Sequence, residues 1–175
     1  MAKAGTSKGQ VISTELVLTF GIFMVALLVF LYIWSEVSYD YLQSQVDQEM
    51  QVVALGISDS LVLTPGDPSD WEISSSVSSI YSFGLASSPN VLSAAKLSKL
   101  QSFNTSYSDA KTGMGAGSFE VSVIANTLNG TPIYQFGTHG DELAQNISSI
   151  KETRLVMLED GALMQLSIQI WRIKG

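Results

Sequence analysis

A run of 24 residues near the N-terminus constrains this chain most: VISTELVLTFGIFMVALLVFLYIW, from Val11 to Trp34, whose single charged side chain is Glu15. About twenty apolar residues in a helix cross the ~30 Å hydrocarbon core of a bilayer. Tyr32 and Trp34 stand at the far end, where amphipathic rings favour the headgroup layer. A helix that is apolar on every side would otherwise need a large protein around it. We therefore expect residues 11–35 to form one transmembrane helix in contact with membrane lipid.

The charges on either side of this run predict its orientation. Lys3 and Lys8 precede it, whereas acidic residues follow it and no Lys or Arg occurs again until Lys96. Basic flanks stay in the cytoplasm by the positive-inside rule. We expect a cytoplasmic N-terminus and an extracellular remainder, in which residues 36–175 carry seven basic and fifteen acidic side chains.

A cleaved secretory signal peptide is the alternative explanation of such an N-terminus. Its apolar region would be shorter and would end in an A-x-A-like site. Here the run is long, and Ser35-Glu36-Val37-Ser38-Tyr39 follows it without such a site. The sequence therefore favours a span that is retained.

Composition argues against several functional classes. The net charge is −7 with no large basic patch, so we expect no nucleic-acid partner. The chain has no cysteine and a single histidine, His139, which disfavours thiolate and multi-histidine metal sites. Asp67, Asp70 and Glu72 offer oxygen atoms to Ca²⁺ but lack the D-x-D-x-D-G spacing. No catalytic motif is present, so we expect no enzyme activity, no cofactor and no bound metal.

The helix is expected to continue past the membrane as an amphipathic segment, residues 36–63. Seven apolar residues recur at spacings of three and four: Tyr39, Leu42, Val46, Met50, Val53, Ile57 and Leu61. Such a stripe is typical of a helix that buries one face, and the opposite face carries polar residues that include Ser58. Thr64-Pro65-Gly66 ends the run. One helix is thus predicted from about Val11 to Leu63.

Residues 64–175, here called the head, are polar and long enough to form their own core. Alternation from Phe119 to Ala125 predicts a strand, and Asn129-Gly130 predicts a tight turn before a second strand. A second hairpin is predicted around Glu159-Asp160-Gly161, between residues 154–158 and 164–171.

The rest of the head is predicted to be helix and loop. We expect a helix over about 90–102, capped by Ser88 or Asn90, with Val91, Leu92, Ala95 and Leu100 facing inward. Residues 113–117 are glycine-rich and predict a flexible connection. Trp71 is expected to pack its loop down.

The sheet predicted for the head needs a cover, and the amphipathic stripe is the natural one. We therefore expect an α+β fold with a basic leader (residues 1–10) and a long N-terminal helix, first transmembrane and then amphipathic. A small antiparallel β-sheet head would pack on the C-terminal half of this helix, in a lollipop layout.

The stretch Lys8-Gly9-Gln10-Val11-Ile12-Ser13-Thr14-Glu15-Leu16 stands at the start of the apolar run. It resembles the processing region of archaeal type IV pilin-like proteins with class III signal peptides, in which a basic leader ends in Lys-Gly and Gln, Ser and Glu follow. Leu63 to Glu72, with Gly84-Leu85-Ala86 after it, is similar to a linker of archaeal single-span proteins with such leaders. The resemblance implies a pilin-like fold, a prepilin peptidase, an assembly platform and other pilin-like subunits as partners.

The resemblance makes Lys8, Gly9 and Gln10 the candidate processing residues. The family spacing is Gln-x-Ser-x-Glu, whereas this chain has one residue more between Gln10 and Ser13. A cut after Gly9 would place Glu15 sixth in the mature chain, and a cut after Gln10 would place it fifth, as expected in pilins. Both registers stay open.

Glu15 is the candidate assembly residue. The resemblance implies that it pairs with the N-terminal amine of a neighbouring subunit in a helical filament. The alternative is a carboxylate near the cytoplasmic interface, which is solvated or favoured by the helix dipole.

Three N-x-[ST] sequons offer possible N-glycosylation sites at Asn104, Asn129 and Asn146. The segment that carries them is expected outside the cell, which suits glycosylation. Serine and threonine are abundant, so chance sequons are the alternative, and Asn129 has a second explanation in its turn geometry. His139 lies in a polar loop, where a solvated side chain is the ordinary outcome.

The sequence therefore favours a non-enzymatic cell-surface, pilin-like subunit that assembles into a type IV pilus-like filament for adhesion or surface interaction. The alternative is a permanently anchored single-span protein whose head is a ligand-binding, surface-layer-binding or stator-like domain. A secreted hydrolase would need a catalytic constellation that the sequence lacks.

Overall fold

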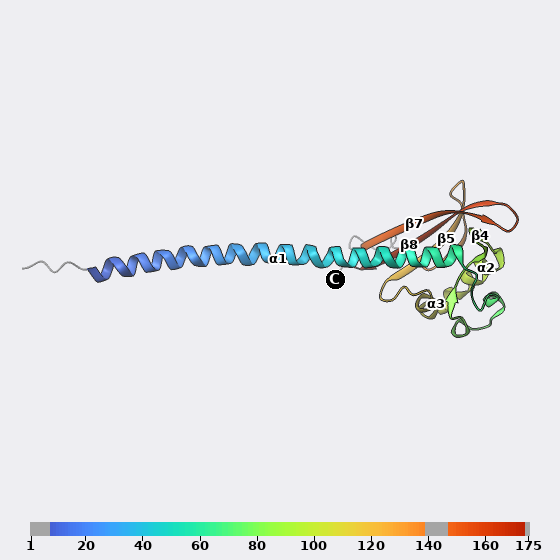
Figure 1. The fold of residues 1–175 in the computed structure, drawn as a ribbon, viewed down its shortest axis with the longest axis horizontal. Helices are drawn as coiled ribbons and strands as arrows, with labels where there is room; N and C mark the ends of the chain where they lie inside the picture. The colour runs from blue at the N-terminus through green and yellow to red at the C-terminus, as the bar shows by residue number, and fades with distance from the viewer. Residues whose placement is uncertain (1–7, 139–146, 174–175) are drawn as a thin grey trace, which may run out of the picture. The chain divides into compact units, whose positions relative to one another are not determined.

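Two compact units make up the chain, residues 1–45 and residues 46–175. The structure is a computed structural model that describes residues 8–138 and 147–173 (Figure 1). Side chains are described from Thr14 onward, except those of residues 39, 40 and 42.

Helix α1, Lys8–Leu63, contributes to both units and confirms the prediction of one long helix that ends at Leu63. It begins three residues before the predicted start. The end has a local cause, because Pro65 has no N–H to donate and Gly66 takes a positive φ of 84°. A Cβ at Gly66 would lie 2.7 Å from the Ser82 carbonyl oxygen, so this sharp turn depends on glycine.

A six-stranded sheet with the order β3-β4-β7-β8-β5-β6 forms most of the second unit. Its strands are β3 (Ala86–Ser88), β4 (Val91–Leu92), β5 (Glu120–Thr127), β6 (Pro132–Phe136), β7 (Ile147–Leu158) and β8 (Leu163–Ile173). Neighbours are antiparallel except for β4 and β7, which are parallel. The α+β class is confirmed, and four of the five strand pairings are antiparallel as predicted, but the sheet is larger than predicted and includes the parallel pair β4–β7. A separate two-stranded sheet joins β1 (Gly66–Asp67) to β2 (Ser82–Phe83).

Both predicted hairpins are present. Asn129-Gly130 turns β5 into β6, and Glu159-Asp160-Gly161 turns β7 into β8. β7 begins at Ile147, seven residues before the predicted start at Arg154, and it pairs with β8 from Ile147 to Met157. The polar stretch 147–153 is therefore held in the sheet by its neighbour rather than by its own alternation.

The helix predicted over about 90–102 is shorter than expected. Helix α2 is Ala94–Ser102, and Ser93 precedes it. Val91 and Leu92 form β4 instead, because Asn90 has a φ of +64°, which reverses the chain between β3 and β4. Ala95, predicted to face inward, is exposed, whereas Leu100 is buried as predicted.

Helix α3, Tyr107–Gly113, is followed by residues that the sequence predicts to be a flexible connection. This prediction was wrong. Ala116 is fully buried in the core, and its N–H donates to the Lys111 carbonyl group over 3.3 Å. The described part of the unit also contains three short 3₁₀ turns: η1 (Trp71–Ile73), η2 (Val77–Ser79) and η3 (Phe103–Ser106).

The C-terminal part of α1 covers one face of the sheet, as predicted, and runs along β7 and β8 (Figure 1). Met50, Ile57 and Leu61 of the predicted stripe are buried, and Val46 and Val53 are partly buried against the same core. The side chains of Tyr39 and Leu42 lie outside the described part of the chain.

Ser58 was predicted on the polar face of α1 and is fully buried instead. Its hydroxyl oxygen accepts a hydrogen bond from Nε of Arg154 on β7 at 3.0 Å, and Nη2 of Arg154 pairs with Asp59 at 2.8 Å. Ser148 of β7 donates to Asp47 at 2.8 Å. A buried hydroxyl is tolerated when it is hydrogen-bonded, so polar contacts as well as apolar ones join helix to sheet.

Trp71 packs its loop into the core, as the sequence predicts. The ring is fully buried, and its Nε1 donates to the Gly84 carbonyl oxygen at 2.8 Å. Phe83 meets the ring edge-on, with 5.2 Å between the centroids.

The contribution of α1 to this core can be measured with two leucines at the end of the helix. Leu61 is 1% exposed and Leu63 is 46% exposed. In a soluble fragment of residues 36–175, we expect Leu61→Ala to lower the free energy of unfolding by about 2–5 kcal/mol, because it leaves a cavity. Leu63→Ala should change it by less than about 1 kcal/mol. Equal losses in urea unfolding would contradict the packing of α1 on the sheet.

Candidate functional site

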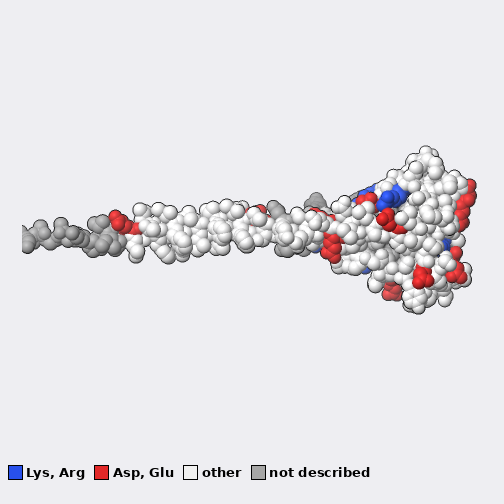
Figure 2. Space-filling model, in the orientation of Figure 1, with Lys and Arg blue, Asp and Glu red and all other residues white. Residues whose placement is uncertain are grey.

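The candidate site is the apolar part of α1 in the first unit, residues 16–34. Sixteen large apolar side chains between Leu16 and Trp34 are exposed, with exposed fractions between 38% and 71%. In the described part of the chain, one helix is long enough and apolar enough to cross a membrane, and it contains this segment. Figure 2 shows an uncharged surface along this part of the helix, beyond the acidic atoms near its start. Such a surface can pack against lipid or against other apolar helices.

Glu15 stands at the N-terminal edge of the apolar surface. It is exposed, and its backbone carbonyl group accepts a hydrogen bond from Thr19 Oγ1 at 2.8 Å. Its carboxylate has no hydrogen-bond or ion-pair partner among the residues that the structure describes. Lys8, Gly9 and Gln10 form the first turn of α1, and their side chains lie outside the described part.

The three sequons fall in different settings. Asn104 is exposed, yet its amide is engaged at both ends: Nδ2 donates to the Gln135 carbonyl group at 3.0 Å and Oδ1 accepts from the Gly137 N–H at 2.7 Å. Asn129 is exposed in the β5–β6 turn, and no hydrogen bond of its side chain is found in the described part of the chain. Asn146 lies outside the described residues. Of the two described sequons, Asn129 is thus the one with an unoccupied amide.

The remaining candidate residues from the sequence are His139 and the three acidic residues Asp67, Asp70 and Glu72. His139 lies outside the described residues. Asp67, Asp70 and Glu72 belong to no metal-binding cluster, since the described residues contain no group of three or more His, Asp or Glu side chains placed to hold an ion.

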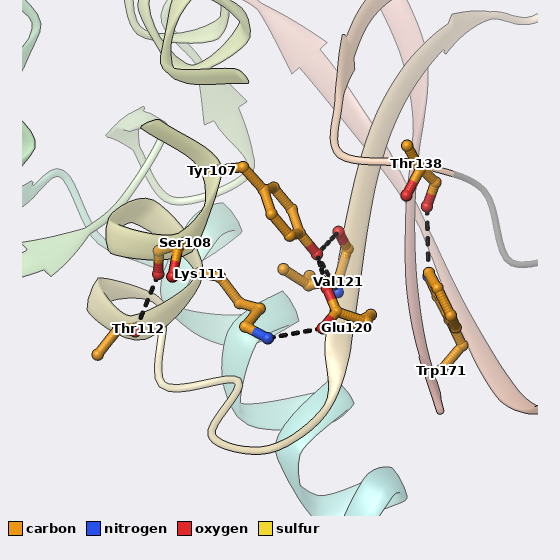
Figure 3. A network of polar contacts seen from close by, with 8 residues as sticks. All are labelled: Tyr107, Ser108, Lys111, Thr112, Glu120, Val121, Thr138 and Trp171. Carbon is orange, nitrogen blue, oxygen red and sulfur yellow. Dashed lines mark hydrogen bonds and ion pairs between the residues drawn. The ribbon is translucent and has the colours of Figure 1, made fainter. Parts of the chain in front are cut away.

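A polar network that the sequence analysis did not identify joins α3 to β5 (Figure 3). Lys111 Nζ lies 2.7 Å from Oε1 of Glu120, and the Tyr107 hydroxyl group donates to Oε2 of Glu120 at 2.7 Å. The same hydroxyl oxygen lies 3.0 Å from both the backbone nitrogen and the carbonyl oxygen of Val121. The sequence signal that could have indicated this network is the spacing of Tyr107 and Lys111, because residues four apart on a helix lie on the same face.

Tyr107 completes the edge of the sheet where β6 ends. Val123 pairs with Phe136, and the chain then turns away at Gly137, whose φ is +76°. A Cβ on Gly137 would lie 2.2 Å from the Val121 carbonyl oxygen, so only glycine allows this close approach. Backbone groups of Val121 would otherwise lack partners, and the tyrosine hydroxyl provides one.

The network also changes the acidity of its members. Burial favours a higher pKa for Glu120, but hydrogen bonds from Lys111 and Tyr107 outweigh it and hold the pKa below its usual value of 4.5. Burial, aided by the neighbouring carboxylate, raises the pKa of Tyr107. Both Glu120 oxygens are occupied by these partners, so the arrangement holds α3 on the sheet rather than activating a nucleophile.

In comparisons with known proteins, no family model, no curated protein and no solved structure matches the chain.

The lowered pKa of Glu120 predicts a pH dependence of stability. Because the pKa is lowered by folding, the stabilisation is present above about pH 4.5 and is lost as the pH falls through the folded-state pKa. We expect Glu120→Gln to weaken the decline in the free energy of unfolding between about pH 6 and about pH 3.

The control for this experiment is Glu159→Gln, in the exposed β7–β8 turn, where no side-chain hydrogen bond involves Glu159 among the described residues. Measured in the soluble fragment of residues 36–175, this variant should keep the pH dependence of stability of the unaltered fragment. An unchanged acid decline in Glu120→Gln would show that the network does not stabilise the head.

Proposed function

We propose that the protein is a non-enzymatic cell-surface subunit that is anchored by residues 16–34 of α1 and assembles into a type IV pilus-like filament for adhesion or surface interaction. The exposed apolar surface of the first unit carries the proposal. Fully burying a large apolar side chain stabilises by about 1.5–3 kcal/mol, so sixteen of them represent tens of kcal/mol. A folded domain is stable by only about 5–15 kcal/mol. Lipid, or other apolar helices, must therefore cover this surface.

The charge distribution supports an N-terminus in the cytoplasm and an extracellular head. Lys3 and Lys8 are the basic residues before the apolar segment, and no Lys or Arg follows before Lys96. The head has excess acidic charge, which suits a solvated surface outside the cell.

Glu15 supports assembly rather than anchoring alone. A carboxylate at the centre of a bilayer costs about 2.5–3.5 kcal/mol, and less near its edge. Among packed apolar helices away from water an unpaired charge costs more, so it needs a cationic partner. Residues 11–95 contain no Lys or Arg. The freed amine of a cleaved neighbouring subunit is the cation that this arrangement supplies.

Processing and assembly define the partners that we propose. A prepilin peptidase would cut next to Gly9 or Gln10, and an assembly platform would extract the subunit from the membrane to join other pilin-like subunits. Asn129, exposed in its turn, is the described sequon best placed to carry a glycan.

One observation favours the second candidate, a permanent anchor. α1 begins at Lys8, so Gly9 and Gln10 lie in a helical turn. Proteolytic sites concentrate in exposed loops and termini, and this bond would have to leave the helix before cleavage. In an uncleaved protein the head would act as a binding or stator-like domain.

The replacement Glu15→Gln separates the two candidates. It keeps the shape of the side chain and removes the charge, so a filament subunit should be made and inserted but should be lost from sheared surface filaments. Glu36→Gln, an exposed carboxylate beyond the apolar segment, is the matched control and should assemble normally.

The measurement compares the sheared surface fraction with the membrane fraction for all three proteins, together with N-terminal sequencing. Equal recovery of Glu15→Gln and the unaltered protein in sheared filaments would exclude the charge pairing. An intact N-terminus and the absence of the unaltered protein from sheared material would establish the anchor instead.

A further inference from the structure

The sheet of the second unit has an open edge along β7. β4 pairs with β7 only at Met157 and Leu158, and no other described strand pairs with that side of β7. On that side the Met157 N–H donates to the Asn90 carbonyl group, whereas the Leu158 N–H donates toward β8. Alternate residues of a strand direct their backbone groups to opposite sides. The open edge therefore carries the N–H and C=O groups of Ser149, Lys151, Thr153 and Leu155.

The other end of the sheet, on β6, is closed by the side chain of Asn104. Its Nδ2 donates to the Gln135 carbonyl group at 3.0 Å, and its Oδ1 accepts from the Gly137 N–H at 2.7 Å. These two backbone groups point away from β5, so they are the ones that a further strand would bond. Pro132, at the start of β6, has no N–H to offer. The Asn104 carboxamide thus occupies the place of an added strand.

The two edges match each other in direction and in level. β7, β8, β5 and β6 are successive antiparallel neighbours, so β6 runs opposite to β7. Thr153 pairs with Ser167, and Ser167 pairs with Ile124. Ile124 pairs with Gln135 in turn, which places Thr153 and Gln135 in one row across the sheet. Both residues direct their backbone groups outward, as the two members of an antiparallel hydrogen-bonded pair do.

The proposed membrane anchor would align two copies for such a pairing. Identical copies that insert in the same orientation share their height and direction. Contacts of Ser148 with Asp47 and of Arg154 with Asp59, both at 2.8 Å, show that β7 and α1 run in the same direction. When two such copies stand side by side, the β6 edge of one faces the β7 edge of the other, with Gln135 opposite Thr153.

We propose that Asn104 is an autoinhibitory contact, which keeps the β7 edge of a neighbouring copy from adding to β6. Without it, every copy would offer a free edge on both sides, and such edges join sheets from copy to copy. Asn104 also belongs to a sequon, but the nitrogen that a glycan needs is the donor to Gln135. This role rests on the proposed insertion of residues 16–34 and not on filament assembly.

Cysteine crosslinking tests this role, because the chain has no cysteine of its own. The full chain in its membrane carries Thr153→Cys and Gln135→Cys together. Within one chain, three strand spacings of about 4.8 Å separate the two positions. That distance is too long for a disulfide, whose Cβ atoms lie about 3.5–4.5 Å apart. Every disulfide therefore joins two copies.

We expect few linked copies while Asn104 is present and a several-fold rise, as a ladder of multiples of the chain mass, with Asn104→Ala. Asn104→Asp, which keeps the acceptor for Gly137 but loses the donor to Gln135, should give an intermediate yield. Ser106→Ala removes the sequon and keeps the amide, so it should behave like the unaltered protein. A ladder with Ser106→Ala would assign the effect to a glycan and overturn the proposal.

Two further variants show whether the linked copies come from the proposed edges. Glu159→Cys, alone in the exposed β7–β8 turn, reports random collision and should not respond to Asn104→Ala. Lys151→Pro removes an N–H of the open edge and leaves the bonds to β8, so it should abolish the ladder of Asn104→Ala. A ladder that persists with Lys151→Pro, or an equal rise at Glu159→Cys, would overturn the pairing of β6 with β7.

Hydrogen exchange and carbonate extraction separate this inference from the proposed function. In Asn104→Ala, the Gly137 amide should lose protection while β5 and β8 keep theirs, which shows a folded head with an opened edge. A folded head in the carbonate-resistant membrane pellet that gives no ladder overturns the role of Asn104 alone. Protein that carbonate releases from the membrane overturns the anchor and, with it, the alignment of the copies.

Discussion

The exposed apolar surface of α1 between Leu16 and Trp34 is the constraint on which the rest of the account depends. None of the described residues covers these sixteen large apolar side chains, and the free energy of leaving them in water exceeds what a folded domain can supply. The proposed membrane insertion, and any proposed assembly through this helix, follow from the need to remove that surface from water. Each proposed role of Glu15 is a response to the same environment, since a carboxylate there must be at an edge or be paired.

The second unit depends on the same helix in a different way. Beyond residue 45, α1 is apolar on one face, and Met50, Ile57 and Leu61 fill the core beneath the sheet. Arg154 reaches from β7 to Ser58 and Asp59, so polar contacts fix the position of the helix along the strand. Along this single helix, the pattern of apolar residues thus changes from apolar all round to apolar on one face.

Local patterns in the sequence predicted the elements whose causes are local. The end of α1 at Pro65-Gly66 and the turns of both hairpins were predicted because proline, glycine and alternation act over a few residues. Val91 and Leu92 were assigned to a helix because their partner, β7, lies more than sixty residues away in sequence. Tyr107 was missed for the same reason: its hydroxyl group completes a strand edge that exists only after β5 and β6 have paired. The apolar segment, residues 16–34, could by contrast be predicted from its composition alone, without knowledge of tertiary contacts.

Protease protection on intact cells tests the central claim most directly, namely that residues 16–34 cross the membrane with the head outside. An epitope is added after Gly175, and protease is applied before and after lysis. The account predicts that the C-terminal epitope is lost from intact cells, whereas a small fragment that contains residues 16–34 stays protected by the membrane. A C-terminal epitope that is digested only after lysis would contradict it.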